Sequence, residues 1–318
     1  MNNYDLASLA KPLITAPLAF SFLNLDQDYS QSLGFDGSAY NLTTRALLSH
    51  CSGLPPWLPY NSTPLKTLLE SDIPWGIHPL LRKAPRKLAC YSDLNYRLLA
   101  EQISLTTQED YLSLAKKYTV LKAFPWTSQC TEIPPGPDYE AWKLIDSQNL
   151  IPPYDPSLPH DINARAGMKG HAGFAANYVE FKESINIWIE DKFPQRMAQE
   201  PKAGENGSLW GLGLQKLRQG AGSLGSLLTR IPLGALKAPL IIEGSSDHIS
   251  PEIPQYHEGE CDWWGHFAFT GPAIFYRPKD QACIGLLTHR KGPDGELLIQ
   301  PQIHARRIEL LGTVVESL

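Results

Sequence analysis

The chain has 318 residues, of which 42% are hydrophobic and 19% charged, and 28 Lys and Arg residues against 33 Asp and Glu residues give a formal net charge of −5. This is the composition of a globular protein, which excludes a disordered or collagen-like chain. A chain of this length removes roughly three quarters of its unfolded surface from water, enough for one large domain or two smaller ones. Its mild acidity, with Lys and Arg scattered, provides no basic surface for phosphates, so nucleic acid is not an expected partner.

The cysteines and the apolar segments indicate the cellular compartment in which we expect the protein. None of the five cysteines forms a CxxC pair, and an odd number cannot all be bridged within the chain, so we expect reduced thiols in a cytoplasmic protein. No run reaches the roughly 20 apolar residues of a membrane span. Residues 12–23 are similar to the apolar part of a signal peptide, but only Lys11 precedes them as a positive charge and two prolines interrupt them. We therefore expect neither a membrane segment nor export.

Helical patterns dominate the first half of the chain. The Thr-Pro pair at 63–64 is typical of an N-cap and a first helical turn. Residues 93–103 carry leucines at helical spacing. Thr107, with Asp110 three residues later, resembles a capping box that opens a further helix. These patterns predict a mainly helical subdomain over residues 25–160.

The second half combines loops, strands and two helices. Prolines recur over 133–160 and predict an irregular loop or linker. Helical patterns return over 177–193 and 306–318. Short aliphatic and aromatic runs bounded by Gly, Pro and Asp predict strands at 209–214, 265–270, 273–276 and 282–288. Residues 219–262, rich in Gly, Ser and Leu and without a clear period, are interpreted as a loop insertion.

These elements predict one α+β domain over residues 1–318. In this interpretation, residues 161–318 together with 1–24 form an antiparallel sheet flanked by helices, and the helical subdomain packs beside it. The expected functional site lies where the two subdomains meet.

The first chemical signal is the segment from Ser8 to Lys11. On a helix this spacing places the hydroxyl and the amine on one face. A serine near a helix start beside a desolvated lysine suits an activated nucleophile with a neighbouring base. The same sequence, Ser-Leu-Ala-Lys, recurs at Ser113 to Lys116 inside a predicted helix, where we interpret it as solvated surface.

Further short motifs follow Ser8 in a fixed order: His50 to Pro55, Tyr91 to Asp93, Gly170 to Phe174, and Gly265 to Gly271. Each is weak alone, but the ordered series resembles the serine β-lactamase and penicillin-binding-protein-like superfamily, particularly its class C, esterase and D-aminopeptidase branch. The resemblance runs from Tyr4 to about the last helix, without the 219–262 segment. It implies a β-lactamase/transpeptidase-like fold.

The resemblance also implies roles for individual residues. Ser8 matches the acylated nucleophile and Lys11 its neighbouring base. Tyr91 matches the tyrosine that shuttles protons between nucleophile, lysine and leaving group. The backbone N–H groups of Ser8 and Phe269 match the oxyanion hole. His266 falls where the third motif has Lys or His, close to Tyr91 and the substrate carboxylate, and is the fourth candidate catalytic residue.

The chain departs from the family pattern in its second and third motifs. Asp93 stands where Asn is usual, so it offers only acceptors and, if ionised, a charge that raises the pKa of Lys11. Phe267 and Ala268 stand where Thr or Ser and then Gly are usual, which removes a hydroxyl used to hold a substrate carboxylate. We expect the Phe267 ring to block polar contacts to that carboxylate, and the methyl group of Ala268 to narrow the approach to the strand. We treat these three positions as candidate substrate-binding residues and do not expect conventional β-lactam recognition.

A third departure concerns the start of the chain. The family usually has a helix and two strands before the nucleophile, whereas seven residues precede Ser8. Without those strands, the sheet would expose an edge with unpaired N–H and C=O groups. We expect either that the true start lies upstream of Met1, the favoured interpretation, or that another element or subunit covers the edge.

Several polar residues receive a structural interpretation. His50, His171, Asp161, Asn163 and Arg165 are expected to order loops. A group in the 219–262 segment has irregular spacing that matches no metal site, so we expect solvated surface and no metal: Asp247, His248, His257, Glu258, Glu260 and Asp262.

The combined interpretation is a serine hydrolase that forms an acyl-enzyme on an ester, amide or peptide of small size, like an esterase or a D-amino-acid peptidase, and that requires no cofactor. The first alternative is a catalytically degenerate binding protein that keeps the cleft. The second is a true β-lactamase. The sequence leaves the oligomeric state open.

Overall fold

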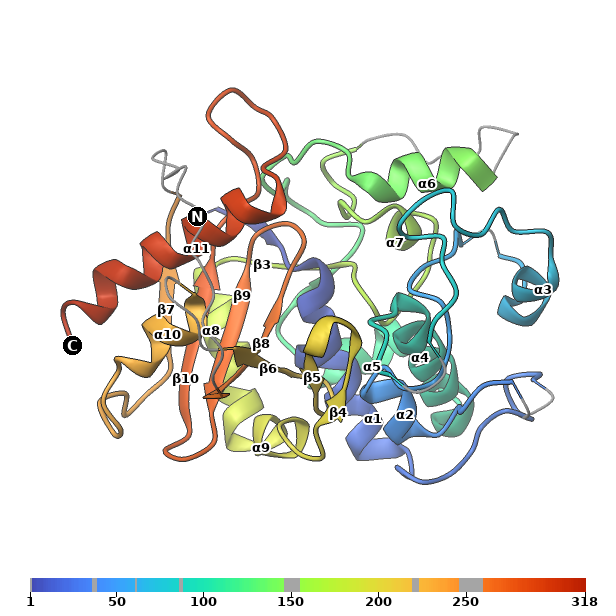
Figure 1. Ribbon diagram of the computed structural model, residues 1–318, viewed down its shortest axis with the longest axis horizontal. Helices are drawn as coiled ribbons and strands as arrows, with labels where there is room; N and C mark the ends of the chain where they lie inside the picture. Colours follow the sequence, from blue (N-terminus) through green and yellow to red (C-terminus); the bar gives the residue numbers. More distant parts are fainter. Residues whose placement is uncertain are drawn as a thin grey trace.

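The computed structural model describes residues 2–35, 39–60, 62–85, 88–145, 155–218, 223–245 and 260–318. Figure 1 shows a sheet with its helices on one side of the molecule and a group of helices on the other. Both chain ends lie on the side of the sheet. In the described part of the chain, no helix combines the length and the apolar character that crossing a membrane requires.

The main sheet has seven strands within the described residues, in the order β4-β5-β6-β8-β9-β10-β7. All neighbouring pairs are antiparallel except β10 with β7, which run parallel. Helices and antiparallel-dominated sheets together confirm the predicted α+β class. The strand bounds are β4 Lys202–Ala203, β5 Leu209–Trp210, β6 Gln215–Arg218, β7 Leu240–Glu243, β8 Glu260–Phe267, β9 Ala273–Arg277 and β10 Ala282–Leu287.

Helices bury both faces of this sheet. Because side chains alternate along a strand, Phe275 of β9 packs in the cluster beneath α10 (Leu224–Thr229) and α11 (Gln300–Val315). Tyr276, the next residue, meets Trp188 of α8 (Tyr178–Glu190) with ring centroids 6.3 Å apart. The predicted helix over 177–193 is present as α8, capped by Asn177 through a capping box, and is followed by α9 (Phe193–Met197). The last helix begins six residues earlier than predicted.

The segment 219–262 differs from the predicted loop insertion. In its described part it contains α10, β7 and the first residues of β8. The sequence of this segment did not reveal these elements, because α10 and β7 are too short to show a hydrophobic period. β7 pairs with β10 from Leu240↔Ile284 to Glu243↔Leu287, so this side of β10 is hydrogen-bonded to another element of the chain.

A second, small sheet anchors the N-terminal segment. β3 (Phe174–Ala176) lies between β1 (Tyr4–Asp5) and β2 (Lys122–Ala123), with both pairs antiparallel. The segment then continues as a 3-10 turn (Ala7–Leu9), a π-helical turn (Lys11–Thr15) and α1 (Ala16–Phe22). Residues 7–22 therefore form an almost continuous helical segment beside the end of β8.

The remaining helices surround this segment, and their bounds correct three expectations. Asp110, and not Thr107, caps the helix that we predicted from the pair, because Thr107 still belongs to the preceding helix. Pro64, and not Thr63, is the cap residue of α3. The proline-rich stretch 133–160 contains a helix, α6, and its residues 146–154 lie outside the described part. The bounds are α2 Thr44–Leu48, α3 Leu65–Glu70, α4 Asp93–Thr107, α5 Tyr111–Tyr118, α6 Pro137–Ile145 and α7 Ile162–Arg165.

Candidate active site

The loop between β1 and the helical segment that carries Ser8 is fixed by a buried carboxylate. Asp5 accepts hydrogen bonds from the backbone N–H of Ala7 at 2.8 Å and of His160 at 2.6 Å. Thr270, just beyond β8, donates its hydroxyl to the carbonyl of Asp5 at 2.6 Å. Burial raises the pKa of Asp5 to about 6, although the two backbone donors oppose that shift. These contacts bring Ser8, which is partly exposed, to the end of β8.

Lys11 lies at the centre of the site and its side chain is fully buried. Its Nζ is 3.0 Å from Ser8 Oγ, 3.1 Å from the carbonyl oxygen of His171 and 2.7 Å from Asp93 Oδ1. Burial alone would lower the pKa of Lys11, but the charge of Asp93 and the nearby Tyr91 oxygen outweigh it, so that pKa is raised. In this geometry Lys11 is an ammonium that donates to Ser8.

Tyr91 reaches the same pair from two residues before the start of α4. Its hydroxyl interacts with both Lys11 and Ser8, and Nζ of Lys11 is 5.0 Å from its ring centroid. The next residue fixes the loop, because Ser92 donates its N–H to His50 Nδ1 at 3.1 Å and its hydroxyl to the carbonyl of Pro55 at 2.6 Å. Burial raises the pKa of Tyr91, Lys11 lowers it and Asp93 raises it again. Ser8, Lys11 and Tyr91, far apart in sequence, thus lie together.

His266 of β8 joins this group through an aromatic cluster. Its ring centroid is 5.9 Å from that of Tyr91 and 6.0 Å from that of Trp210 in β5. His50 completes the cluster, 4.6 Å from Tyr91 and 4.8 Å from Trp210. Burial first and the charge of Lys11 second lower the pKa of His266 to about 3, so its imidazole is neutral. Neither ring nitrogen makes a hydrogen bond of standard geometry to the described residues.

The residue that follows His266 in β8, Phe267, directs its ring to a different face of the sheet from the one we expected. The Phe267 ring packs 5.7 Å from Phe275 and 6.1 Å from His304, on the α11 face of the sheet. It lies on that face because neighbouring residues of a strand point to opposite faces. We expected the Phe267 ring to obstruct polar contacts in the cleft, and this expectation is wrong. Ala268 is buried, with its N–H donated to the carbonyl of Pro272 at 2.8 Å.

Phe269 lies just beyond β8 and its ring is held from both sides. The ring stacks on His160 with centroids 5.1 Å apart, and the guanidinium of Arg290 lies 4.0 Å from its centroid. Arg290 also donates to the carbonyl of Phe269 at 3.4 Å. These contacts fix the backbone at the position that the motif assigns to an oxyanion hole, and the use of the Ser8 and Phe269 N–H groups there stays a prediction.

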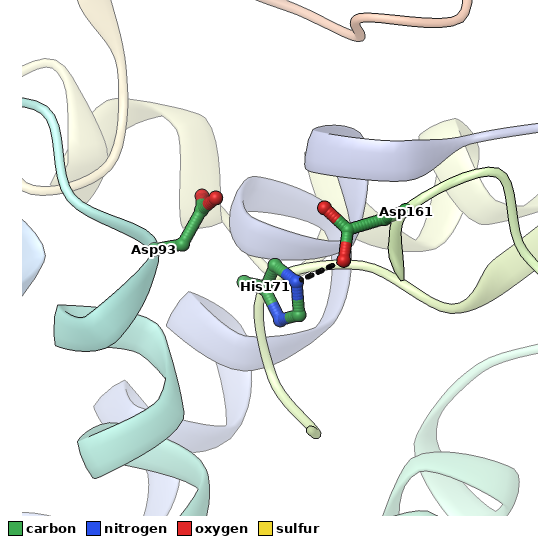
Figure 2. A group of neighbouring side chains, drawn as sticks. All are labelled: Asp93, Asp161 and His171. Atoms are coloured by element: carbon green, nitrogen blue, oxygen red, sulfur yellow. Dashed lines mark hydrogen bonds and ion pairs between the residues drawn. The ribbon is translucent and has the colours of Figure 1, made fainter. Parts of the chain in front are cut away.

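Three residues at the site have the donor types of a metal centre: Asp93, Asp161 and His171, with ligand atoms within 4.8 Å of one another (Figure 2). The dashed contact in Figure 2 joins His171 Nε2 to Asp161 Oδ1 at 2.8 Å. The Lys11 ammonium, however, lies 2.7 Å from Asp93, so a divalent ion bound to that carboxylate would be repelled by an adjacent positive charge. We therefore interpret the cluster as the support of Lys11.

The polar residues that we expected to order loops do so. Asp161 caps α7 by accepting from the N–H of Ala164 at 2.8 Å, and Asn163 donates to the carbonyl of Leu58 at 2.9 Å. His171 holds Lys11 through its backbone carbonyl, a contact that no side-chain pattern could indicate. The acidic and His residues at 247–258 lie outside the described residues. Asp262 forms a surface ion pair with Lys279 at 2.5 Å.

Sequence analysis missed Trp210, Asp5 and the cavity beside Tyr91. This cavity has a volume of about 430 Å³ and is lined by Tyr91, Trp210 and polar or charged side chains of β6 and the turn before β5, including Glu205, Gln215 and Arg218. A cavity of about 650 Å³ lies elsewhere, along α4 and residues 167–169, and none of the candidate site residues lines it. The short strands β4 to β6 gave no period that could have pointed to the first cavity.

The comparisons with known proteins place the fold. No family model and no curated protein matches the sequence. Among solved structures, D-amino acid amidase from Ochrobactrum anthropi SV3 with L-phenylalanine has a TM-score of 0.56 at 15% identity, covering 99% of this chain and 86% of that chain. The same amidase with L-phenylalanine amide gives 0.53 at 14% identity, covering 99% and 84%. A β-lactamase from Mycobacterium bovis gives 0.47 at 16% identity, covering 99% and 87%.

The two amidase comparisons extend over nearly the whole chain, and at this identity they speak for the fold alone. They agree with the ordered motifs and with the sheet that α8 and α11 cover. The chain therefore has the β-lactamase/transpeptidase-like fold that serine β-lactamases, penicillin-binding proteins and D-amino acid amidases share.

Proposed function

We propose that the protein is a serine hydrolase that cleaves an ester or amide of a small molecule through an acyl-enzyme on Ser8. One observation carries the proposal: a partly exposed serine hydroxyl lies 3.0 Å from a buried lysine amine, and that amine lies 5.0 Å from the ring centroid of a tyrosine from a distant part of the chain. An SxxK segment that occurs by chance is not expected to have a buried lysine. Lys116 of the second such segment is exposed on α5, as we predicted.

In the proposed reaction, Ser8 Oγ attacks the substrate carbonyl carbon while its proton passes to the Tyr91–Lys11 pair. The carbonyl π electrons move to oxygen, and the N–H groups of Ser8 and Phe269 are proposed to stabilise that oxyanion. When the oxyanion collapses, the bond to the leaving alkoxide or amine breaks and the leaving group takes the proton back from Tyr91. A water molecule then repeats the sequence on the acyl ester and frees Ser8.

His266 is proposed to contact the substrate, because its neutral ring lies beside Tyr91 without a standard hydrogen bond. The cavity next to Tyr91, about 430 Å³ in volume, adjoins one of the candidate catalytic residues and is proposed to hold part of a small ester or amide. The fold neighbours include an amidase that was solved with L-phenylalanine amide, and we extend amides of the amino-acid type to this chain as part of the proposal.

A fluorophosphonate probe followed by peptide mapping tests the proposal. We expect labelling on Ser8 and its loss in Ser8→Ala. The matched control is Ser113→Ala, which changes the same four-letter segment on the surface and should label like the unmodified chain. A folded protein that reacts at no pH between 6 and 11 would refute the hydrolase.

A second candidate is a binding protein that keeps the cleft without turnover. The contact between Asp93 and Lys11 favours it, because an ammonium cannot accept the proton of Ser8. Calorimetric binding of an amino-acid amide by a chain that resists the probe would support this candidate. A true β-lactamase remains the third, and mass spectrometry after incubation with a penicillin would reveal its acyl adduct.

A further inference from the structure

The shell of atoms around Lys11 Nζ favours one protonation state of that nitrogen. Three oxygen atoms lie within 3.1 Å of it, from Asp93, Ser8 and His171. An ammonium has three N–H donors for these three oxygens, whereas a neutral amine would donate to two of them and accept the hydroxyl proton of Ser8. The carboxylate of Asp93, 2.7 Å from Nζ, favours the charged form, and Asp93 is the one carboxylate in direct contact with Lys11 among the described residues.

We infer that Asp93 is a positioning residue that keeps Lys11 an ammonium and thereby moves the working range of the Ser8 site to alkaline pH. The inference rests on the proposed function and adds to it the origin of its pH dependence. Asp93 occupies the first position of α4, where the helix N-terminus favours a negative side chain beside the lysine.

Other titratable groups face Lys11 from every neighbouring element. From the aromatic cluster come His50 and His266, whose pKa values are lowered, first by burial and then by Lys11, so both are neutral. Tyr96 of α4 presents its ring 5.8 Å from Nζ. Asp161 is ionised, with its pKa lowered to about 2 despite burial, chiefly by His171, toward which its carboxylate is directed. Among these groups only Asp93 supplies a carboxylate oxygen at contact distance.

The charge of Asp93 opposes both forms of the site that can accept the proton of Ser8. If Lys11 is the acceptor, it must first become a neutral amine, and Asp93 raises the pKa of that lysine. If Tyr91 is the acceptor, it must first become a phenolate, and Asp93 raises the pKa of that tyrosine as well. An amide at position 93 keeps the shape and one acceptor oxygen for Lys11 but removes the charge. Both acceptors then become available at lower pH.

The test measures the second-order rate of fluorophosphonate labelling at Ser8 between pH 6 and 11 for the full chain. In Asp93→Asn we expect the midpoint of the pH profile to move down by about one to three units, as for loss of a contacting opposite charge, with labelling at pH 7 faster by about tenfold or more. Asp93→Glu retains the charge and should keep an alkaline midpoint. Asp262→Asn, which removes a carboxylate from a surface lysine pair, is the matched control and should leave the profile unchanged.

A direct readout keeps the inference separate from catalysis and from the folding of any variant. In the unmodified protein with ε-¹³C-lysine, NMR should show the signal that is lost in Lys11→Met still in the ammonium form at pH 10. The inference is overturned if that signal titrates below the ordinary lysine range, or if Asp93→Asn folds and keeps the unmodified midpoint. If Ser8 reacts at no pH while Lys11 remains an ammonium, the hydrolase proposal fails and the role of Asp93 stands.

Discussion

Acid should destabilise this protein in part because His160 is buried as a neutral imidazole. Its ring is stacked against Phe269 and is 7% exposed, and its pKa is lowered to about 4, first by burial and also by the nearby Arg165 and Arg290. A histidine in the unfolded chain has a pKa near 6.5. Because the folded pKa is the lower one, the unfolded chain binds more protons between these values, so stability falls as pH drops from about 6.5 through 4.

The size of the effect follows from the two pKa values. A difference of about 2.5 units at ~1.4 kcal/mol per unit gives a full loss of about 3.5 kcal/mol. About 3 kcal/mol of it is lost between pH 7 and pH 4, because the folded imidazole is half-protonated at pH 4. Other groups also titrate in this range, so the measurement is a difference between variants. Urea unfolding at pH 7 and pH 4 should show that the unmodified protein loses about 3 kcal/mol more than His160→Gln does, because the variant has no imidazole to charge.

Asp5 makes the stability of the protein change in the opposite direction over the same pH range. Burial raises its pKa to about 6, above its unfolded value, so the folded state is favoured as pH falls through 6 and the carboxyl becomes neutral. Between pH 7 and pH 4 the unmodified protein should therefore gain about 2 kcal/mol relative to Asp5→Asn. Equal acid losses in His160→Gln and the unmodified protein would refute the buried neutral histidine, and the Asp5 variant shows whether the assay detects a change of this size.

Three substitutions test the packing that holds the site. Gly170→Ala places a Cβ 2.2 Å from the carbonyl oxygen of Tyr96 at a φ of +94°, so it should lower the free energy of unfolding in urea by about 1–3 kcal/mol. It should also slow probe labelling, because it shifts the carbonyl of His171 that contacts Lys11. Trp210→Ala removes a ring that is 7% exposed from the aromatic cluster and should cost about 3–5 kcal/mol in the same assay; a loss under 1 kcal/mol would contradict the packing. Ile241→Ala in β7 should cost about 2–5 kcal/mol, and an unchanged unfolding midpoint would mean that β7 contributes little to covering β10.

The sequence predicted the parts of the fold whose signals are local. The capping box at Asn177 and the leucines of α4 mark helices because the pattern and the structure lie in the same few residues. β7 and α10 were missed because strands of four residues and helices of six owe their form to partners elsewhere in the chain, here β10 and the sheet face. Thr107 was assigned to the wrong helix because a capping residue and a helix end have overlapping preferences one turn apart.

The candidate site divides in the same way. Ser8, Lys11, Tyr91 and His266 could be named because they carry side-chain chemistry in recognisable motifs. The carbonyl of His171 could not, since every residue has a carbonyl and only the chain path decides which one reaches Lys11. The direction of the Phe267 ring was open to prediction: alternation along β8 places it opposite His266, a consequence of strand geometry that the motif comparison alone does not express.

The two SxxK segments separate sequence spacing from chemistry. Both place a serine and a lysine one helical turn apart, but Lys11 is fully buried with three oxygens around its nitrogen, whereas Lys116 is exposed on α5. Burial makes the protonation of Lys11 depend strongly on a single neighbouring charge, because the low dielectric environment strengthens that contact and water cannot replace it. Exposure leaves Lys116 with ordinary solvation. What distinguishes a candidate catalytic pair from a surface pair is therefore the enclosure of the lysine, which the distant segments carrying Asp93 and His171 provide.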